Sequence, residues 1–263
     1  MNGDEAITNG WAVVTGANRG LGLEFTRQLL ESGNCVAACC LNLEVADDLR
    51  RLGEDAGDRL VVVPLDVSDS ASIESGAETL RTLTSGIALL IHNAGIFATG
   101  EEGLAGFTRE EMLRVFDVNL FGPLTLTRDL LPVLRSGGKV FVLTSRTGAL
   151  RPPAQGKPGS QFSYPSSKAA VHRMVPVLAD DLRPKGIIVG GIDPGWVRTG
   201  MTSGAQPAGR FQLEPGESVR GMLKVIDSVT LDASGRLWRW NGEHSRWYAP
   251  EETADERQEV SDS

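Results

Sequence analysis

Cysteines, histidines and long apolar runs are scarce in this 263-residue chain. The three cysteines, Cys35, Cys39 and Cys40, fall in one apolar stretch. Because their number is odd and their spacing shows no metal-ligand pattern, we expect buried free thiols, as in a reducing cytoplasm. The three histidines are scattered, at positions 92, 172 and 244. We therefore predict no bound metal.

Positive charge and membrane-spanning stretches are also missing. The formal net charge is -8 and the pI is about 5.0, which argues against nucleic acid as a partner. The longest apolar run, CVAACCL at 35–41, is far short of the roughly 20 residues that span a bilayer. The first ten residues, MNGDEAITNG, lack the basic and apolar regions of a secretory signal. We expect a cytoplasmic protein with no membrane partner.

Short apolar runs alternate with helical patterns along most of the chain. The strands are continuously apolar, as in a parallel sheet that helices cover on both faces. This pattern predicts an α/β fold, a single-domain, Rossmann-like, doubly wound parallel sheet. We expect strands at 11–16, 35–41, 59–66, 87–95, 139–145 and 186–195, and helices at 20–32, 43–52, 70–84, 108–135 and 164–183.

No composition shift or linker divides the chain, so we assign residues 11–250 to one domain. Residues 1–10 form an N-terminal extension, and the acidic stretch 251–263 is predicted to be a mobile tail. Two long segments rich in glycine and proline, 146–163 and 199–216, follow strand ends. Loops of this length in a compact domain are usually functional, and we expect the second to be a substrate lid.

A glycine-rich turn stands where the first predicted strand meets the first helix. The stretch VVTGANRGLG (13–22) places Gly16, Gly20 and Gly22 in the spacing G-x-x-x-G-x-G. Glycines let the backbone approach a pyrophosphate closely, and the helix that follows offers unpaired N–H groups. A glycine turn alone is weak evidence, but its position after the first strand of an α/β repeat predicts a nucleotide site.

Tyr164 and Lys168 lie four residues apart in FSYPSSKAAVHRM, a spacing that puts both on one helical face. They could be an ordinary tyrosine and a surface lysine. Alternatively they are a catalytic pair, in which the ammonium lowers the tyrosine pKa from its usual value of about 10. Pro165 favours a position for Tyr164 at the beginning of the helix.

Seven motifs, in order, resemble those of the short-chain dehydrogenases/reductases, and of their C-factor and sniffer-like carbonyl reductase subgroup in particular. The resemblance covers about residues 11–248, including a closing segment GRLWRWNGEHSRW. The motifs are Thr15-Gly16-Ala17-Asn18-Arg19-Gly20-Leu21-Gly22, Asp66-Val67, Asn93-Ala94-Gly95, Asn119, Ser145, Tyr164 with Lys168, and Pro194-Gly195-Trp196-Val197-Arg198-Thr199.

The resemblance implies an oxidoreductase that interconverts a carbonyl and an alcohol by hydride transfer. Tyr164 would be the general acid/base, Ser145 would bind the carbonyl oxygen, and Lys168 would bind the nicotinamide ribose. Asn119 would hold a water for proton return, or tie up backbone at a helix irregularity. Cofactor-binding residues would be Thr15, Gly16, Asn18, Arg19, Gly20, Leu21, Gly22, Asp66, Val67, Asn93, Ala94, Gly95, Tyr164, Lys168, Pro194, Gly195, Val197 and Thr199.

The cofactor is predicted to be NADP(H), with NAD(H) not excluded. NAD-preferring dinucleotide folds place an acid after the second strand, and residues 39–42 contain none. Arg19 stands just before the second motif glycine, where the resemblance implies contact with a 2′-phosphate. The second basic residue that the resemblance leads one to expect, near Leu41, is missing.

Two other activities remain open from the sequence: a non-catalytic nucleotide-binding sensor or scaffold, and an epimerase or dehydratase on the same fold. The substrate is expected to be a small apolar or aromatic carbonyl compound, because Trp196, Met201, Phe211 and Phe97 are candidate pocket residues. Family habit and the apolar stretch 120–134 favour a homodimer or homotetramer.

Overall fold

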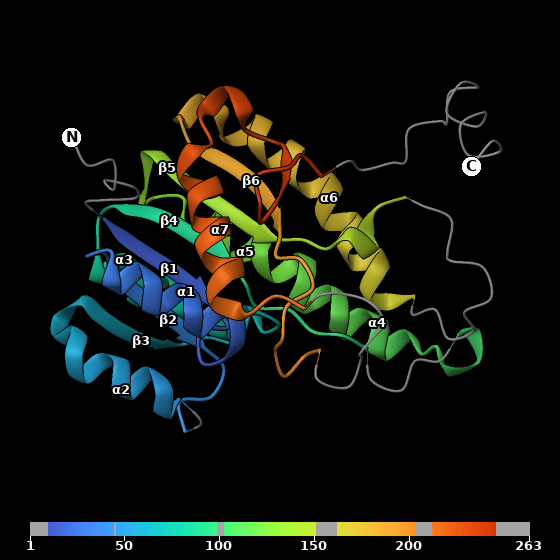
Figure 1. Cartoon of the computed structure of the whole chain (residues 1–263), viewed down its shortest axis with the longest axis horizontal. Helices are drawn as coiled ribbons and strands as arrows, with labels where there is room; N and C mark the ends of the chain where they lie inside the picture. Colours follow the sequence, from blue (N-terminus) through green and yellow to red (C-terminus); the bar gives the residue numbers. More distant parts are fainter. Residues whose placement is uncertain (1–9, 45, 99–102, 151–161, 203–211, 246–263) are drawn as a thin grey trace.

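A seven-stranded parallel sheet, covered by helices on both faces, organises the chain (Figure 1). The computed structural model describes residues 10–44, 46–98, 103–150, 162–202 and 212–245. The strand order is β3-β2-β1-β4-β5-β6-β7. The strands are β1 (Trp11–Thr15), β2 (Cys35–Cys40), β3 (Leu60–Pro64), β4 (Ile87–His92), β5 (Leu134–Leu143), β6 (Ile188–Asp193) and β7 (Leu237–Arg239). The predicted single Rossmann-like α/β fold is confirmed.

Seven α-helices accompany the strands within the described residues: α1 (Gly20–Glu31), α2 (Asp47–Ala56), α3 (Ser70–Leu83), α4 (Arg109–Phe116), α5 (Gly122–Leu130), α6 (Ser163–Leu182) and α7 (Pro215–Ser228). The apolar residues of each strand alternate between two core clusters, as the pleat of a strand requires. On β1, Val13 joins the cluster that includes α3, α5 and α6. Its neighbours Ala12 and Val14 join the cluster that includes α1, α2 and α7. The prediction that the continuously apolar strands are buried on both faces is thus confirmed.

Several predicted boundaries were wrong, for identifiable reasons. The helix expected at 108–135 is three elements, because a π-helix, Asp117–Phe121, joins α4 to α5 and the chain then turns into β5. Strand β5 begins at Leu134, which pairs with Ile87 across a register shift. The helix expected at 43–52 begins only at Asp47.

Two elements were not predicted, α7 and β7. Helix α7 begins at Pro215, within the stretch 199–216 that was predicted to be a lid, and Val197 forms a bridge with Leu213. Residues 203–211 of that lid lie outside the described residues. So do 151–161 of the other long loop, 1–9 of the N-terminal extension and the predicted tail 251–263.

All neighbouring strands run parallel, so their carboxyl ends meet along one edge of the sheet. Strands β1 and β4 are neighbours in the middle of the sheet, and the chain order runs outward from them in opposite directions. Open α/β sheets bind ligands at such a point. Among the described helices, none is long and apolar enough to cross a membrane.

Candidate active site

The carboxyl ends of β1 and β4 are joined by side chains of two predicted motifs. The Thr15 hydroxyl accepts the backbone N–H of Asn93 at 3.1 Å and that of Ala94 at 3.0 Å. The Asn93 amide donates to the carbonyls of Thr15, at 2.8 Å, and Gly16, at 3.1 Å. These bonds hold the glycine-rich turn and the Asn93-Ala94-Gly95 segment together at the carboxyl ends of β1 and β4, where they form one wall of the candidate site.

The glycine-rich turn leaves no space for side chains where it packs. A Cβ on Gly22 would lie 2.2 Å from the Gly16 carbonyl oxygen, and one on Gly16 would lie 3.0 Å from Ala94 Cα. Gly16 also has a φ of 63°, a conformation that favours glycine. Helix α1 begins with no side-chain hydrogen bond from its N-cap, Arg19. Bare backbone and the free N–H groups of a helix terminus fit a pyrophosphate.

The segment after β6 completes this wall. The methyl carbon of Thr199 lies 3.7 Å from the position of a Gly20 Cβ, so the first and last predicted motifs meet. The Ser218 hydroxyl of α7 donates to the Pro194 carbonyl at 2.7 Å. Gly195 has a φ of 83°, and a Cβ there would clash with Leu213. Val197 is buried and forms a bridge with Leu213.

The other residues predicted to bind the cofactor lie in the turn after β3 and around the start of α1. The Asp66 carboxylate accepts the N–H and the hydroxyl of Ser68, at 2.8 and 2.6 Å, which shapes the turn after β3. Val67 packs on α5, where its carbonyl lies 2.4 Å from a Gly122 Cβ position. Asn18 and Leu21 are half-buried in the turn and in α1, and Arg19 is exposed.

Tyr164 lies in the first turn of α6, followed by Pro165, as expected. Lys168 follows one turn later, with its Nζ 5.7 Å from the centre of the Tyr164 ring. Ser145, directly beyond β5, hydrogen-bonds the Tyr164 hydroxyl and accepts the Thr147 hydroxyl at 2.9 Å. The helical spacing and the strand end thus bring together the three residues that sequence reasoning grouped.

One expectation about this group is wrong. The Lys168 ammonium was expected to lower the tyrosine pKa, but burial raises the pKa of Tyr164 to about 12, although the hydrogen bond from Ser145 partly offsets the rise. The negative charge of Asp193 also raises the Tyr164 pKa. The phenol is therefore protonated at neutral pH, the state that can give a proton to a carbonyl oxygen.

Lys168 is 4% exposed, and its ammonium donates to the Leu143 carbonyl at 2.8 Å. Burial lowers the pKa of Lys168 to about 8, so it still carries its charge at pH 7. The same ammonium lies 3.7 Å from the position of a Gly95 Cβ. Lys168 therefore faces the wall at the end of β4.

Asn119 lies in the π-helix, the irregularity that the structural interpretation of this residue anticipated. Its amide oxygen accepts the Ile96 N–H at 2.9 Å, and its amide nitrogen donates to the Ile96 carbonyl at 3.0 Å. The same nitrogen donates to Ser167 at 3.0 Å. Gly95 lies between this amide and Lys168, so Asn119 shapes the floor beside the lysine.

Sequence reasoning missed several residues that support this site. Ser167 donates to the Tyr164 carbonyl at 2.8 Å and links it to Asn119. His172 is buried one turn beyond Lys168, beside the backbone of Ser145 and Gly148. Asp193 is a buried carboxylate at the end of β6. Two sequence signals could have found them. Ser167 and His172 have helical spacing from Tyr164, and Asp193 is a carboxylate directly before Pro194.

Aromatic residues stand beside Tyr164. The Phe97 ring meets the Tyr164 ring edge-on, with centroids 4.2 Å apart. Trp196 is half-buried in the segment after β6, and Met201 is 47% exposed. Phe211 lies outside the described residues. His92, buried at the end of β4, contacts the Thr127 hydroxyl at 2.8 Å.

Comparison with known proteins agrees with this geometry. Residues 10–208 match the family model described as short chain dehydrogenase. The chain belongs to this family. The C-signal protein of Myxococcus xanthus is 38% identical over 170 residues, which cover 62% of this chain and 95% of that protein. A 1-hydroxy-2-glutathionyl-2-methyl-3-butene dehydrogenase of Rhodococcus sp. (strain AD45) is 30% identical, over 89% of this chain and 98% of that protein.

Solved structures place this short-chain dehydrogenase within the C-factor and sniffer-like subgroup. An NADPH-bound carbonyl reductase from chicken fatty liver superposes with a TM-score of 0.81 at 33% identity. The match covers 90% of this chain and 98% of that one. The carbonyl reductase Sniffer of D. melanogaster shares the fold, with a TM-score of 0.78. The family establishes an oxidoreductase that acts on a small molecule.

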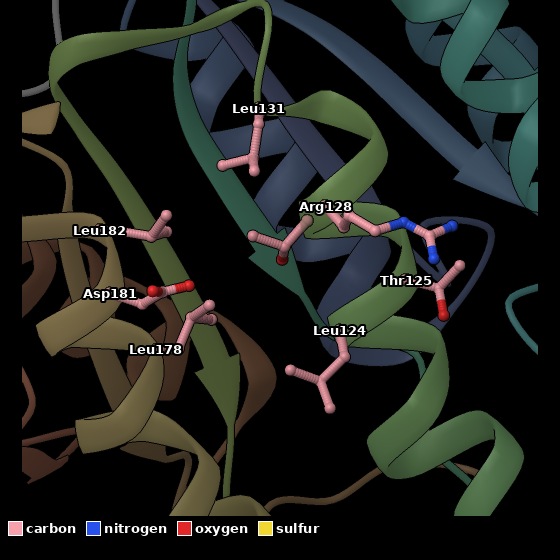
Figure 2. A pocket seen from close by; sticks show the side chains of 8 residues that line it. Leu124, Thr125, Arg128, Leu131, Leu178, Asp181 and Leu182 are labelled. Carbon is pink, nitrogen blue, oxygen red and sulfur yellow. The ribbon is translucent and has the colours of Figure 1, made fainter.

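A groove of about 310 Å³ opens elsewhere on this short-chain dehydrogenase, between α5 and α6 (Figure 2). Leucines of both helices line it, together with Asp181 on α6 and Arg128 on α5, whose guanidinium points away from Asp181. None of the predicted catalytic residues lines this groove, so it does not belong to the candidate active site. Its lining is Leu124, Thr125, Thr127, Arg128, Leu131, Leu178, Asp181 and Leu182.

Proposed function

We propose that this short-chain dehydrogenase is an NADP(H)-dependent oxidoreductase that interconverts a ketone or aldehyde and an alcohol, with Tyr164 as the general acid/base. The observation that carries the proposal is the placement of Tyr164 in the first turn of α6, with Ser145 beside its hydroxyl and Lys168 Nζ 5.7 Å from the centre of its ring. The similarity to a dehydrogenase and to an NADPH-bound carbonyl reductase supports it.

The residues of the glycine-rich turn and the segment after β6 would hold the cofactor, because their backbone leaves the space that a dinucleotide needs. When bound, the nicotinamide supplies or accepts a hydride. Ser145 donates a hydrogen bond to the substrate carbonyl oxygen and stabilises the negative charge that develops there. Tyr164 gives that oxygen its proton. Lys168, still charged at pH 7, stabilises the phenolate that remains.

Asn119 would contribute through its neighbours. Its amide is fully occupied with the Ile96 backbone and Ser167. It therefore positions Gly95 and the backbone around Lys168. These bonds correspond to the structural interpretation of Asn119, and its role in holding a water for proton return stays a prediction.

The first test replaces the phenol hydroxyl. Tyr164→Phe keeps the ring against Phe97 but removes the proton donor, so we expect turnover of NADPH with a responsive carbonyl compound to fall by about 100- to 10,000-fold. Tyr248→Phe, which changes the other tyrosine of the chain, is the matched control and should keep its activity.

Three outcomes separate the alternatives. Unchanged turnover in Tyr164→Phe would remove the tyrosine from the mechanism. Tight NADPH binding without oxidation across a panel of carbonyl compounds would favour a sensor or scaffold. A product that forms without net consumption of the cofactor would favour an epimerase or dehydratase.

We propose that NADP(H) is preferred over NAD(H) because Arg19 is exposed beside the glycine turn. Loss of one charge-assisted hydrogen bond costs about 1.5–3 kcal/mol. Arg19→Ala should therefore raise the Kd for NADPH by about 10- to 100-fold in calorimetric titrations and leave the Kd for NADH nearly unchanged. Equal losses for both cofactors would contradict the preference.

We also propose that the substrate carries an apolar or aromatic group, since Phe97 lies against the Tyr164 ring. A homodimer is proposed as the assembled form. Arg128 of α5 and Asp181 of α6 both line the α5–α6 groove, and the Arg128 guanidinium points away from its own Asp181. A two-fold axis along this groove would pair each Arg128 with the partner's Asp181 and cover the leucines.

A further inference from the structure

The closing segment GRLWRWNGEHSRW (235–247) has no role in the proposed reaction, although it forms part of the family resemblance. Strand β7 of this segment pairs with β6. Directly after β7, the Trp240 N–H donates to the Asp193 carbonyl at 2.9 Å. The Arg239 N–H donates to the Glu243 carbonyl at 2.8 Å as the chain turns back. The backbone of Trp240 is therefore fixed beside the carboxyl end of β6.

The indole of Trp240 packs against Gly195, in the segment after β6 that would hold the cofactor. A Cβ on Gly195 would lie 2.9 Å from Trp240 Cδ1 and 3.0 Å from Trp240 Nε1. Leu213 also contacts this position, with its Cδ1 2.8 Å from that Cβ. Atoms at these distances leave no room for a side chain. Glycine at 195 is therefore required both by its φ of 83° and by the indole.

Another part of Trp240 packs on α7. A Cβ on Gly221 would lie 2.5 Å from the Trp240 carbonyl oxygen and 2.8 Å from Trp240 Cε3. Glycine is unfavourable inside a helix, and the close approach of Trp240 accounts for it here. Ser218, three residues earlier in α7, donates to the Pro194 carbonyl at 2.7 Å. Helix α7 therefore supports the Pro194-Gly195 turn directly through Ser218 and indirectly through Trp240.

We propose that Trp240 is a positioning residue, whose indole fixes the backbone of residues 194–199 in the conformation that receives the nicotinamide end of the cofactor. The inference rests on the proposed function, in which the reacting nicotinamide has to lie beside Ser145 and Tyr164. The segment after β6 begins next to β5, whose end leads to Ser145. The adenosine end would be held by the glycine-rich turn and the start of α1, which lie on other elements. Loss of the indole should therefore weaken binding of the nicotinamide end selectively.

Two ligands separate the contributions of the two ends of the cofactor. NADPH contains the nicotinamide, whereas 2′-phospho-ADP-ribose is the same molecule without its nicotinamide ring. If Trp240→Ala loosens residues 194–199, binding has to order the backbone of one or two residues. The Kd for NADPH should then rise by about 5- to 30-fold in calorimetric titrations. The Kd for 2′-phospho-ADP-ribose should change by less than about twofold, because its contacts lie on other elements.

Three further variants complete the test. Trp240→Phe keeps an aromatic ring against Gly195 and should restore most of the NADPH affinity. Trp238→Ala is the matched control, because Trp238 belongs to the same segment but stacks on His244, with ring centroids 4.0 Å apart. It should leave the ratio of the two Kd values unchanged. Gly221→Ala displaces Trp240 from the side of α7, so it should reproduce the selective loss if Trp240→Ala fails to fold.

A general loss of stability would weaken the binding of both ligands alike. Equal losses for the two ligands in the folded variants Trp240→Ala and Gly221→Ala, or an unchanged NADPH affinity in both, would therefore overturn the inference. A selective loss of NADPH binding, in a protein that oxidises NADPH with no carbonyl compound, would reject the proposed function and leave the inference standing. Turnover by the parent together with equal losses in the variants would do the reverse.

Discussion

Lys168 shows how a single residue can serve the site at the expense of stability. It is almost fully buried, and burial lowers its pKa to about 8 from 10.5. The unfolded chain therefore binds more protons than the folded chain between these two pH values. The buried ammonium therefore lowers the free energy of unfolding. This destabilisation is complete below about pH 8, declines as the pH rises, and is gone above about pH 10.5.

This penalty makes a prediction for Lys168→Met. The variant should lose most of its turnover, yet its free energy of unfolding at pH 6.5 should rise by roughly 1–3 kcal/mol, because each pKa unit corresponds to about 1.4 kcal/mol and the bond to Leu143 is lost. The gain should shrink as the pH approaches 10. Denaturant unfolding at several pH values measures both effects.

The matched control for that experiment is Lys224→Met, which changes an exposed lysine of α7. Its free energy of unfolding should change by no more than about 0.5 kcal/mol. If Lys168→Met is less stable than the parent at every pH, the buried ammonium does not carry the penalty assigned to it.

At the scale of elements, the start of α1 depends on close backbone approach. Gly22 packs so tightly that a Cβ would lie 2.2 Å from the Gly16 carbonyl oxygen. Gly53 of α2 is different, because the nearest atom to a Cβ there is a Leu60 methyl carbon at 3.9 Å. Gly22 and Gly53 lie in two helices that cover the same face of the sheet, yet only Gly53 has room for a side chain.

Gly22→Ala should lower the free energy of unfolding by about 1–3 kcal/mol, since overpacking forces the backbone to shift. It should also weaken NADPH binding, because the turn that would hold the pyrophosphate moves. Gly53→Ala should instead raise the free energy of unfolding by up to about 1 kcal/mol through helix propensity. Denaturant unfolding and cofactor titration of both variants check this, and equal effects would contradict it.

Helix boundaries were the least predictable feature at this scale. The apolar stretch 108–135 has helical periodicity, but nothing local in it signals that Asn119 bonds to Ile96, 23 residues earlier in the chain. The π-helix, Asp117–Phe121, coincides with that tertiary contact. Helix α7 begins at the end of the Gly- and Pro-rich segment 199–216 and strand β7 has only three residues, so neither stands out in the apolar pattern of the sequence.

At the scale of the whole molecule, the α5–α6 groove tests the proposed homodimer. Arg128 is 69% exposed in its side chain and also contacts its neighbour Asp129. Arg128→Glu and Asp181→Arg should each weaken the dimer, because each places like charges opposite one another across the axis. The double variant restores opposite charges and should recover the dimer, as sedimentation equilibrium can show. A parent that is monomeric at micromolar concentration would reject the interface.

The sequence by itself determined the parallel sheet and the positions of the candidate site residues within it. Continuous apolar strands, turn glycines and helical spacing are local properties, and each fixes how neighbouring residues must lie. They were sufficient to place Gly16, Gly22, Tyr164 and Lys168 correctly in the fold.

Only the tertiary structure decided the electrostatics of the site. The pKa of Tyr164 depends on how deeply its ring is buried and on the charge of Asp193, which lies on a different element. Burial outweighs the effect expected from the nearby lysine. Removal of a phenolate from water destabilises it more than an ammonium 5.7 Å from the centre of the ring stabilises it. Such balances depend on groups far apart in the chain, so no local pattern contains them.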